Sequence, residues 1–216
     1  MAASEGPSPD RDCPLCPRLV AFRERQRATF PQWHNAPVPS FGDANGRLLI
    51  VGLAPGLRGA NRTGRPFTGD YAGNLLYATL GEFGFARGKY EERPDDALEL
   101  VDCRIANAVR CVPPENKPEP SEIRTCHRFL TGEISAMTNL VSVLALGKIA
   151  HDAVVRALGG RIAAYPFRHG AVHEFAAIAL ADSYHCSRYN TNTGRLTTAM
   201  FETVIGALRG RLDQTA

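Results

Sequence analysis

The sequence predicts an α/β protein, a three-layer αβα sandwich around a central, mainly parallel four-stranded sheet. Short apolar runs without polar alternation occur four times along the chain, as is typical of strands that are buried on both faces. Segments with helical composition separate these runs, and alternating strands and helices favour a parallel sheet. The chain has 216 residues and 44% of them are hydrophobic, enough for one sizeable core.

Each element follows from its local pattern. The strands are predicted at 47–53, 105–109, 140–146 and 175–181. The helices are predicted at 18–27, 74–83, 121–137, 148–158 and 198–208. No internal repeat and no linker marks a second domain, so residues 1–216 are expected to form one domain, with 1–46 as an amino-terminal extension.

Charge and apolar length restrict the possible partners. The net charge is +3, and only Lys89, Lys117 and Lys148 among the 25 basic residues are lysines. Arginine suits phosphate contacts, although a GC-rich genome produces the same bias. No apolar stretch approaches the roughly 20 residues that span a bilayer, and no apolar run follows Met1. We therefore expect a soluble, cytoplasmic protein without a membrane partner.

Six cysteines in a reducing compartment do not indicate a disulfide framework. Cys13 and Cys16 form a C-x-x-C pair, whereas Cys111 and Cys126 stand on either side of a turn-rich segment. The pair alone is compatible with zinc, with a redox dithiol or with neither.

The glycine-rich loop from Gly52 to Gly73 follows the first predicted strand. It lacks both the P-loop ending and the dinucleotide-binding spacing. Carboxyl ends of parallel strands form the edge where ligands bind, and Asn107 and His185 also follow strands. Taken by themselves, Phe67 is compatible with a core residue and Asp70 with a helix cap.

Four motifs in order resemble one known family. The stretches are Cys13-Pro-Leu-Cys16, then Gly52-Leu-Ala-Pro-Gly with Gly59-Ala-Asn-Arg-Thr-Gly-Arg-Pro-Phe-Thr-Gly-Asp70, then Asn107-Ala-Val-Arg-Cys-Val-Pro-Pro-Glu-Asn-Lys-Pro-Glu-Pro120, and finally His185-Cys-Ser-Arg-Tyr-Asn190. Together they resemble the type 5 uracil-DNA glycosylases, and the similarity extends from Cys13 to about Phe201.

The resemblance implies a cofactor. It matches Cys13, Cys16, Cys111 and Cys126 to the four ligands of a [4Fe–4S] cluster, which would tie down the amino-terminal extension. Zinc remains the alternative, because Cys₄ sites also bind zinc and His127 is close in sequence. Cys103 and Cys186 match no ligand position, and we expect them to be buried as small apolar side chains.

The resemblance also implies a role for each site residue. Phe67 would stack on a flipped base, and Asn107 would read its Watson–Crick edge. Asp70 would stabilise the cationic sugar or orient water, and His185 would stabilise charge on uracil O2. The remaining substrate-binding residues implied are Gly52, Leu53 and Asn190.

Two departures from the family pattern concern this site. Ala54 stands where several sister families place a water-activating carboxylate or Asn, so the chemistry would depend on Asp70. Cys186 replaces the usual Pro after His185, which leaves the backbone φ at that position less restricted.

The expected function is that of a monofunctional DNA glycosylase. It would be a monomer that excises uracil, and other deaminated bases such as hypoxanthine or xanthine, from double-stranded DNA in base excision repair. Lys117 is the only lysine in a motif, so a Schiff base is not expected. The alternatives are a catalytically weakened DNA-binding protein that recognises damaged or abasic sites, and a zinc or redox protein.

Overall fold

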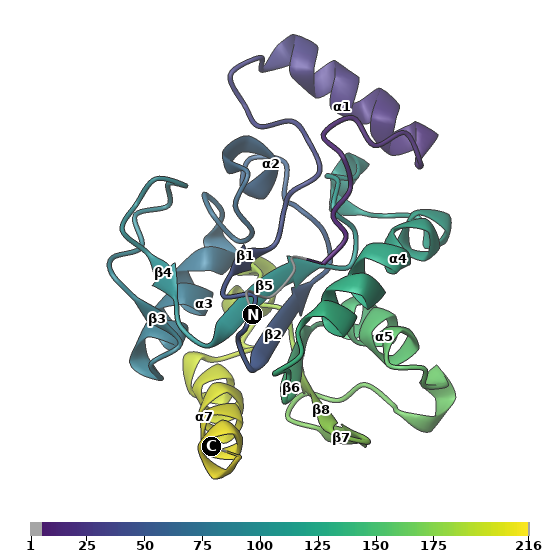
Figure 1. Cartoon of the computed structure of the whole chain (residues 1–216). Helices are drawn as coiled ribbons and strands as arrows, with labels where there is room; N and C mark the ends of the chain where they lie inside the picture. Colours follow the sequence, from purple (N-terminus) through teal and green to yellow (C-terminus); the bar gives the residue numbers. More distant parts are fainter. Residues whose placement is uncertain (1–5, 216) are drawn as a thin grey trace.

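The computed structural model describes residues 6–215, and its centre is a six-stranded sheet (Figure 1). The strand order is β1-β5-β2-β6-β8-β7, in which the inner four strands run parallel. These four are the predicted parallel strands: β2 (Leu48–Gly52), β5 (Cys103–Asn107), β6 (Ser142–Leu146) and β8 (Ile178–Ser183). The predicted fold class is confirmed, and the second strand lies two residues earlier than expected.

Two antiparallel edge strands were not predicted. They are β1 (Phe41–Gly42), which pairs with β5, and β7 (Val172–Phe175), which pairs with β8. The start predicted for the fourth strand, residue 175, is wrong because the chain reverses at Ala176, where φ is 47°. The uninterrupted apolar composition of Phe175–Ala181 conceals this turn.

Helices cover both faces of the sheet, as the two sets of alternating side chains in β2 require. Leu48 and Ile50 share one core with α3 (Tyr71–Glu82) and α7 (Thr198–Gln214). Leu49 and Val51 share the other core with α4 (Pro120–Ala136) and α5 (Lys148–Ala157). Because all four side chains are fully buried, the sequence of β2 shows no polar alternation.

The remaining elements lie outside these three layers. Helix α1 (Pro17–Thr29) is attached to α4 by a bidentate ion pair between Arg18 and Glu122, with both N–O distances 2.8 Å. The other elements are α2 (Ala60–Thr63), β3 (Ala86–Arg87), β4 (Glu99–Leu100), the 3₁₀ turns η1 (Pro114–Asn116) and η2 (Ile162–Ala164), and α6 (Arg188–Asn192). Among residues 6–215, no helix is both long and apolar enough to cross a lipid bilayer.

Candidate active site and cysteine centre

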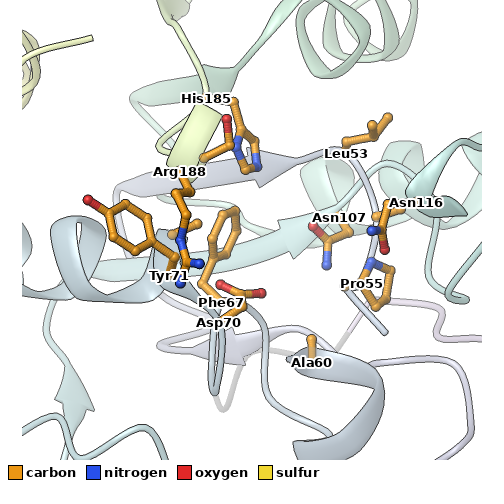
Figure 2. Close-up of a pocket in the computed structure, with 14 residues that line it drawn as sticks. Leu53, Pro55, Ala60, Phe67, Asp70, Tyr71, Asn107, Asn116, His185 and Arg188 are labelled. Carbon is orange, nitrogen blue, oxygen red and sulfur yellow. The ribbon is translucent and has the colours of Figure 1, made fainter. Parts of the chain in front are cut away.

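A pocket of about 340 Å³ opens where β2, β5 and β8 reach their carboxyl ends (Figure 2). This is the edge of the sheet at which the sequence placed a ligand site. Five predicted site residues line the pocket: Leu53, Phe67, Asp70, Asn107 and His185. Gly52 and Asn190 do not line the pocket, but both contact residues that do.

Phe67 forms one wall of the pocket. Its side chain is only 6% exposed, and its ring centroid lies 5.8 Å from that of His185. Its backbone has a φ of 51°, a conformation that bulky L-residues rarely adopt. The ring therefore packs in the hydrophobic core and also lines the pocket.

Gly52 makes room for the residues that line the pocket. A Cβ atom at this position would lie 2.5 Å from Oδ1 of Asn107 and 2.7 Å from Cζ of Phe67. Any larger residue would displace one of these two side chains, so the contribution of Gly52 to the site is steric.

Asn107 is the last residue of β5, and its side chain is 3% exposed. Figure 2 shows this side chain beside the pocket. Its side-chain amide makes no hydrogen bond with any residue in the described range 6–215. A buried amide that is not paired within the protein keeps one donor group and one acceptor available for a ligand.

Asp70 occupies the residue position of an N-cap for α3, but its side chain makes no capping hydrogen bond. Its Oδ1 is buried and has no partner among residues 6–215, and the carboxylate packs tightly against Gly59, where a Cβ would lie 2.3 Å from Oδ2. Burial raises the pKa of Asp70, an effect that the nearby amides of Gly73 and Ala72 only partly counter. The carboxylate therefore faces the first turn of α3 without a well-formed capping hydrogen bond, and its Oδ1 stays unpaired.

His185 follows β8 and lies near Phe67 in the pocket (Figure 2). Burial lowers the pKa of His185 to about 4, so the imidazole is neutral at pH 7 and has one N–H donor.

Asn190 braces the backbone of this loop. Its Nδ2 donates to the carbonyl oxygen of His185 at 2.8 Å, and Ser187 accepts from the Asn190 N–H as the N-cap of α6. Cys186 is fully buried, as is Cys103, in agreement with the apolar role expected for both. The side chain of Asn190 thus restrains the backbone at His185, directly before Cys186, the position at which the family pattern has a proline.

Three residues that received no pocket role from the sequence also line the site: Tyr71, Asn116 and Arg188. The Arg188 guanidinium lies 5.1 Å from the centre of the Tyr71 ring. Asn116 has a φ of 56°, and its Oδ1 accepts from the Leu57 N–H at 3.4 Å. Asn116 lies between the third and fourth cysteines of the expected cluster, and only the fold brings that loop to the pocket.

The four predicted cysteine ligands converge on a second, small cavity. Cys13, Cys16, Cys111 and Cys126 all line it, although they come from three separate segments of the chain. The Arg110 backbone N–H donates to Sγ of Cys126 at 3.3 Å. The Arg23 guanidinium, 3% exposed, lies 3.9 Å from Sγ of Cys111. N–H groups directed at sulfur are the surroundings that a cluster of thiolates requires.

Burial raises the pKa of three of these thiols, Cys126 among them. It raises the pKa of Cys16 to about 11 and that of Cys111 to about 12, and proximity to Cys126 adds to both of these increases. A bound metal would have to supply the positive charge that stabilises the thiolates. His127 is not among the residues around this cavity, and its Nδ1 lies 3.3 Å from Oγ1 of Thr131 one turn along α4.

Comparison with known proteins matches most of the chain. The profile of the family described as the uracil DNA glycosylase superfamily matches residues 39–209. A type-5 uracil-DNA glycosylase from Thermus thermophilus is 48% identical over 200 residues, which cover 89% of this chain and 90% of the relative. A protein of the same name from Pyrobaculum aerophilum is 40% identical over 203 residues, with 92% and 87% covered.

A type-4 uracil-DNA glycosylase from Pyrobaculum aerophilum is more distant, at 34% identity over 152 residues, with 70% of this chain and 63% of the relative covered. The greater identity and coverage of the type-5 proteins agree with the branch that the four motifs indicate. The chain belongs to the uracil-DNA glycosylase superfamily, and within it to the type 5 branch of N-glycosidic hydrolases.

Proposed function

We propose that this protein removes uracil from DNA by hydrolysing the N-glycosidic bond, as the first step of base excision repair. The main support is one pocket that contains a carboxylate whose buried Oδ1 has no partner among residues 6–215, an imidazole that is neutral at pH 7, the side-chain amide of Asn107 and an aromatic ring. The names of the type-5 relatives state the same substrate for those proteins.

The first task of the pocket is to hold a base that has left the helix stack, because the glycosidic bond is inaccessible inside a duplex. Phe67 offers a ring face for stacking. The amide of Asn107 can accept from N3–H and donate to O4 of uracil, the pattern that distinguishes uracil from cytosine.

The second task is to stabilise separated charge. As the bond breaks, the sugar becomes cationic and the base leaves as an anion. The Asp70 carboxylate, when ionised, stabilises the sugar and orients a water molecule toward it, and Ala54 offers no polar side chain for that purpose. His185, being neutral, donates its N–H to O2 of the departing base.

The wider substrate range is also part of the proposal. A volume of about 340 Å³ falls within the ordinary range of small-molecule sites, about 300–1,000 Å³, and leaves room for purines such as hypoxanthine and xanthine. We propose that a monomer acts on double-stranded DNA.

We further propose that the cysteine centre holds a [4Fe–4S] cluster. The support is the convergence of four thiols on one small cavity with N–H donors beside two of the sulfurs. When bound, the cluster would supply a covalent cross-link between the amino-terminal extension, the loop after β5 and helix α4. Iron content, and visible absorbance of protein purified without oxygen, test this, and zinc in place of iron would contradict it.

The decisive experiment is a panel of duplexes that carry one uracil, hypoxanthine or xanthine. We expect excision of uracil at a rate that depends on Asp70, followed by strand cleavage only after alkali treatment, because no lysine lines the pocket. Tight binding to the lesion or to an abasic site with no excision would favour the alternative, a weakened DNA-binding protein.

A further inference from the structure

A surface loop between β3 and β4, residues 88–98, lies against the turn that presents Phe67. Within it, the Tyr90 hydroxyl donates to the Phe67 carbonyl oxygen at 3.0 Å and accepts from the Gly69 N–H at 3.3 Å. One phenolic oxygen therefore bridges both ends of the 67–69 turn. Tyr90 is absent from the pocket lining and makes no contact that the proposed chemistry uses.

The turn is strained, so it needs such a restraint. Phe67 and Gly69 have φ values of 51° and 80°, and a bulky side chain at positive φ persists only where its surroundings fix it. The α3 residue Gly73 packs tightly against the hydrogen bond between Tyr90 and Phe67. A Cβ atom at Gly73 would lie 2.0 Å from the Phe67 carbonyl oxygen and 2.4 Å from the Tyr90 hydroxyl.

The loop is itself anchored to the same segment. Arg65 and Asp96 form a bidentate ion pair with N–O distances of 2.7 and 2.8 Å, and both side chains are buried. Asp96 also accepts from the Glu91 N–H at 2.9 Å, which closes the loop on itself. Because the loop is fixed at Asp96, the Tyr90 hydroxyl reaches the turn from a defined position.

We propose that Tyr90 is a positioning residue for the glycosylase reaction, and this inference rests on the function proposed above. By bridging Phe67 and Gly69, its hydroxyl sets the ring that stacks on the flipped base and the start of α3, where the Asp70 carboxylate meets the sugar.

The test is Tyr90→Phe, which removes the hydroxyl and keeps a ring to pack on Tyr77, whose centroid lies 4.7 Å away. We expect single-turnover excision of uracil to fall about tenfold, because the variant loses both hydrogen bonds that hold the turn. Affinity for undamaged duplex should stay unchanged, and amide hydrogen exchange should accelerate within 67–73. In the matched control, Tyr165→Phe, the lost hydroxyl makes no hydrogen bond within residues 6–215, so no change is expected.

A second pair of variants probes the contact without altering Tyr90. Gly73→Ala should reduce excision similarly, because its Cβ would push the Phe67 carbonyl and the Tyr90 hydroxyl apart. Gly81→Ala, in the same helix with no atom within 4 Å, should leave the rate unaltered. This pair decides the question should Tyr90→Phe fail to fold.

Wild-type excision rates in both Tyr90→Phe and Gly73→Ala would overturn the inference, as would unchanged exchange within 67–73 in the Tyr90 variant. Should the wild-type protein excise no base, the proposed function fails. The exchange measurement would then still report whether Tyr90 restrains the turn.

Discussion

Two groupings of aspartate and histidine lie in this fold, one half-buried in the pocket and one around the fully buried Asp182, and they differ in how completely their polar atoms are paired. In the pocket, Oδ1 of Asp70 has no partner within residues 6–215, and burial lowers the pKa of His185 to about 4. On β8, Asp182 accepts from Nδ1 of His151 at 2.7 Å and lies 3.2 Å from Nε2 of His173. The second grouping is paired and the first is not.

The pairing of His151 determines its charge. Its Nδ1 faces the Asp182 carboxylate and its Nε2 faces the Tyr165 carbonyl oxygen, both at 2.7 Å, and two acceptors favour the protonated ring, in which both nitrogens donate. Burial by itself would lower the pKa of His151, but the hydrogen bond and charge of Asp182 outweigh it and raise the pKa. The comparison indicates that the paired groups around Asp182 stabilise the fold, whereas the unpaired groups of the pocket are available to bind a substrate.

The strongest test of this comparison is Asp70→Asn. Loss of a preorganised electrostatic group typically costs about 10²–10³ in rate, so single-turnover excision should fall by that factor. The midpoint of thermal unfolding should not fall, because Asn serves as well as Asp at a helix N-cap and burial disfavours the charged carboxylate. A near-wild-type rate would remove Asp70 from the chemistry and leave His185 and water as the catalytic groups.

Asp182→Asn should show the opposite result, a loss of stability with little effect on the rate of excision. Removing one partner of a buried ion pair costs about 3–5 kcal/mol, and we expect the lower end because His151 can release its proton. Urea unfolding monitored by circular dichroism measures this loss. Asp152→Asn breaks an exposed pair with Lys148 and removes only the smallest of the charge effects on His151, so it serves as the control, with an expected loss below about 1 kcal/mol. Equal losses in both variants would contradict the structural role of the paired grouping.

Substitutions at the pocket wall should separate stacking from base reading. Phe67→Ala should weaken the binding of every base alike, by about 1–3 kcal/mol. Asn107→Ala should lower excision and also change the preference among uracil, hypoxanthine and xanthine, because it removes the amide donor and acceptor. Competition between lesion duplexes measures both effects. An identical base profile in both variants would show that Asn107 does not read the base.

The smallest expected effect is a pH dependence of stability that arises from His151. Its folded pKa lies above the unfolded value of about 6.5. The stabilisation is therefore fully present below that value and is lost as the pH rises through the folded pKa. His151→Asn should reduce this slope in the free energy of unfolding. A slope that persists in the variant would assign the effect to another group.

Much of the site could be predicted from the sequence because its residues follow strands with clear apolar patterns. Gly52 and Asn107 end β2 and β5, and adjacent parallel strands place their carboxyl ends at one edge. Buried strands depend on local hydrophobicity, which a sequence shows directly. The cysteines that converge on the second cavity matched a motif that fixes their order, although their proximity depends on the fold.

Tertiary contacts alone decided the rest. The positive φ of Phe67, the uncapped side chain of Asp70 and the Tyr90 bridge depend on loops that meet from separate parts of the chain. The paired state of His151 likewise requires β8 and the segment after α5 to meet. By itself the sequence determined the family, the four parallel strands and the main chemical groups of the pocket, because local patterns and ordered motifs encode them. Which of these groups are paired and which remain free is decided by long-range packing, which no local pattern records.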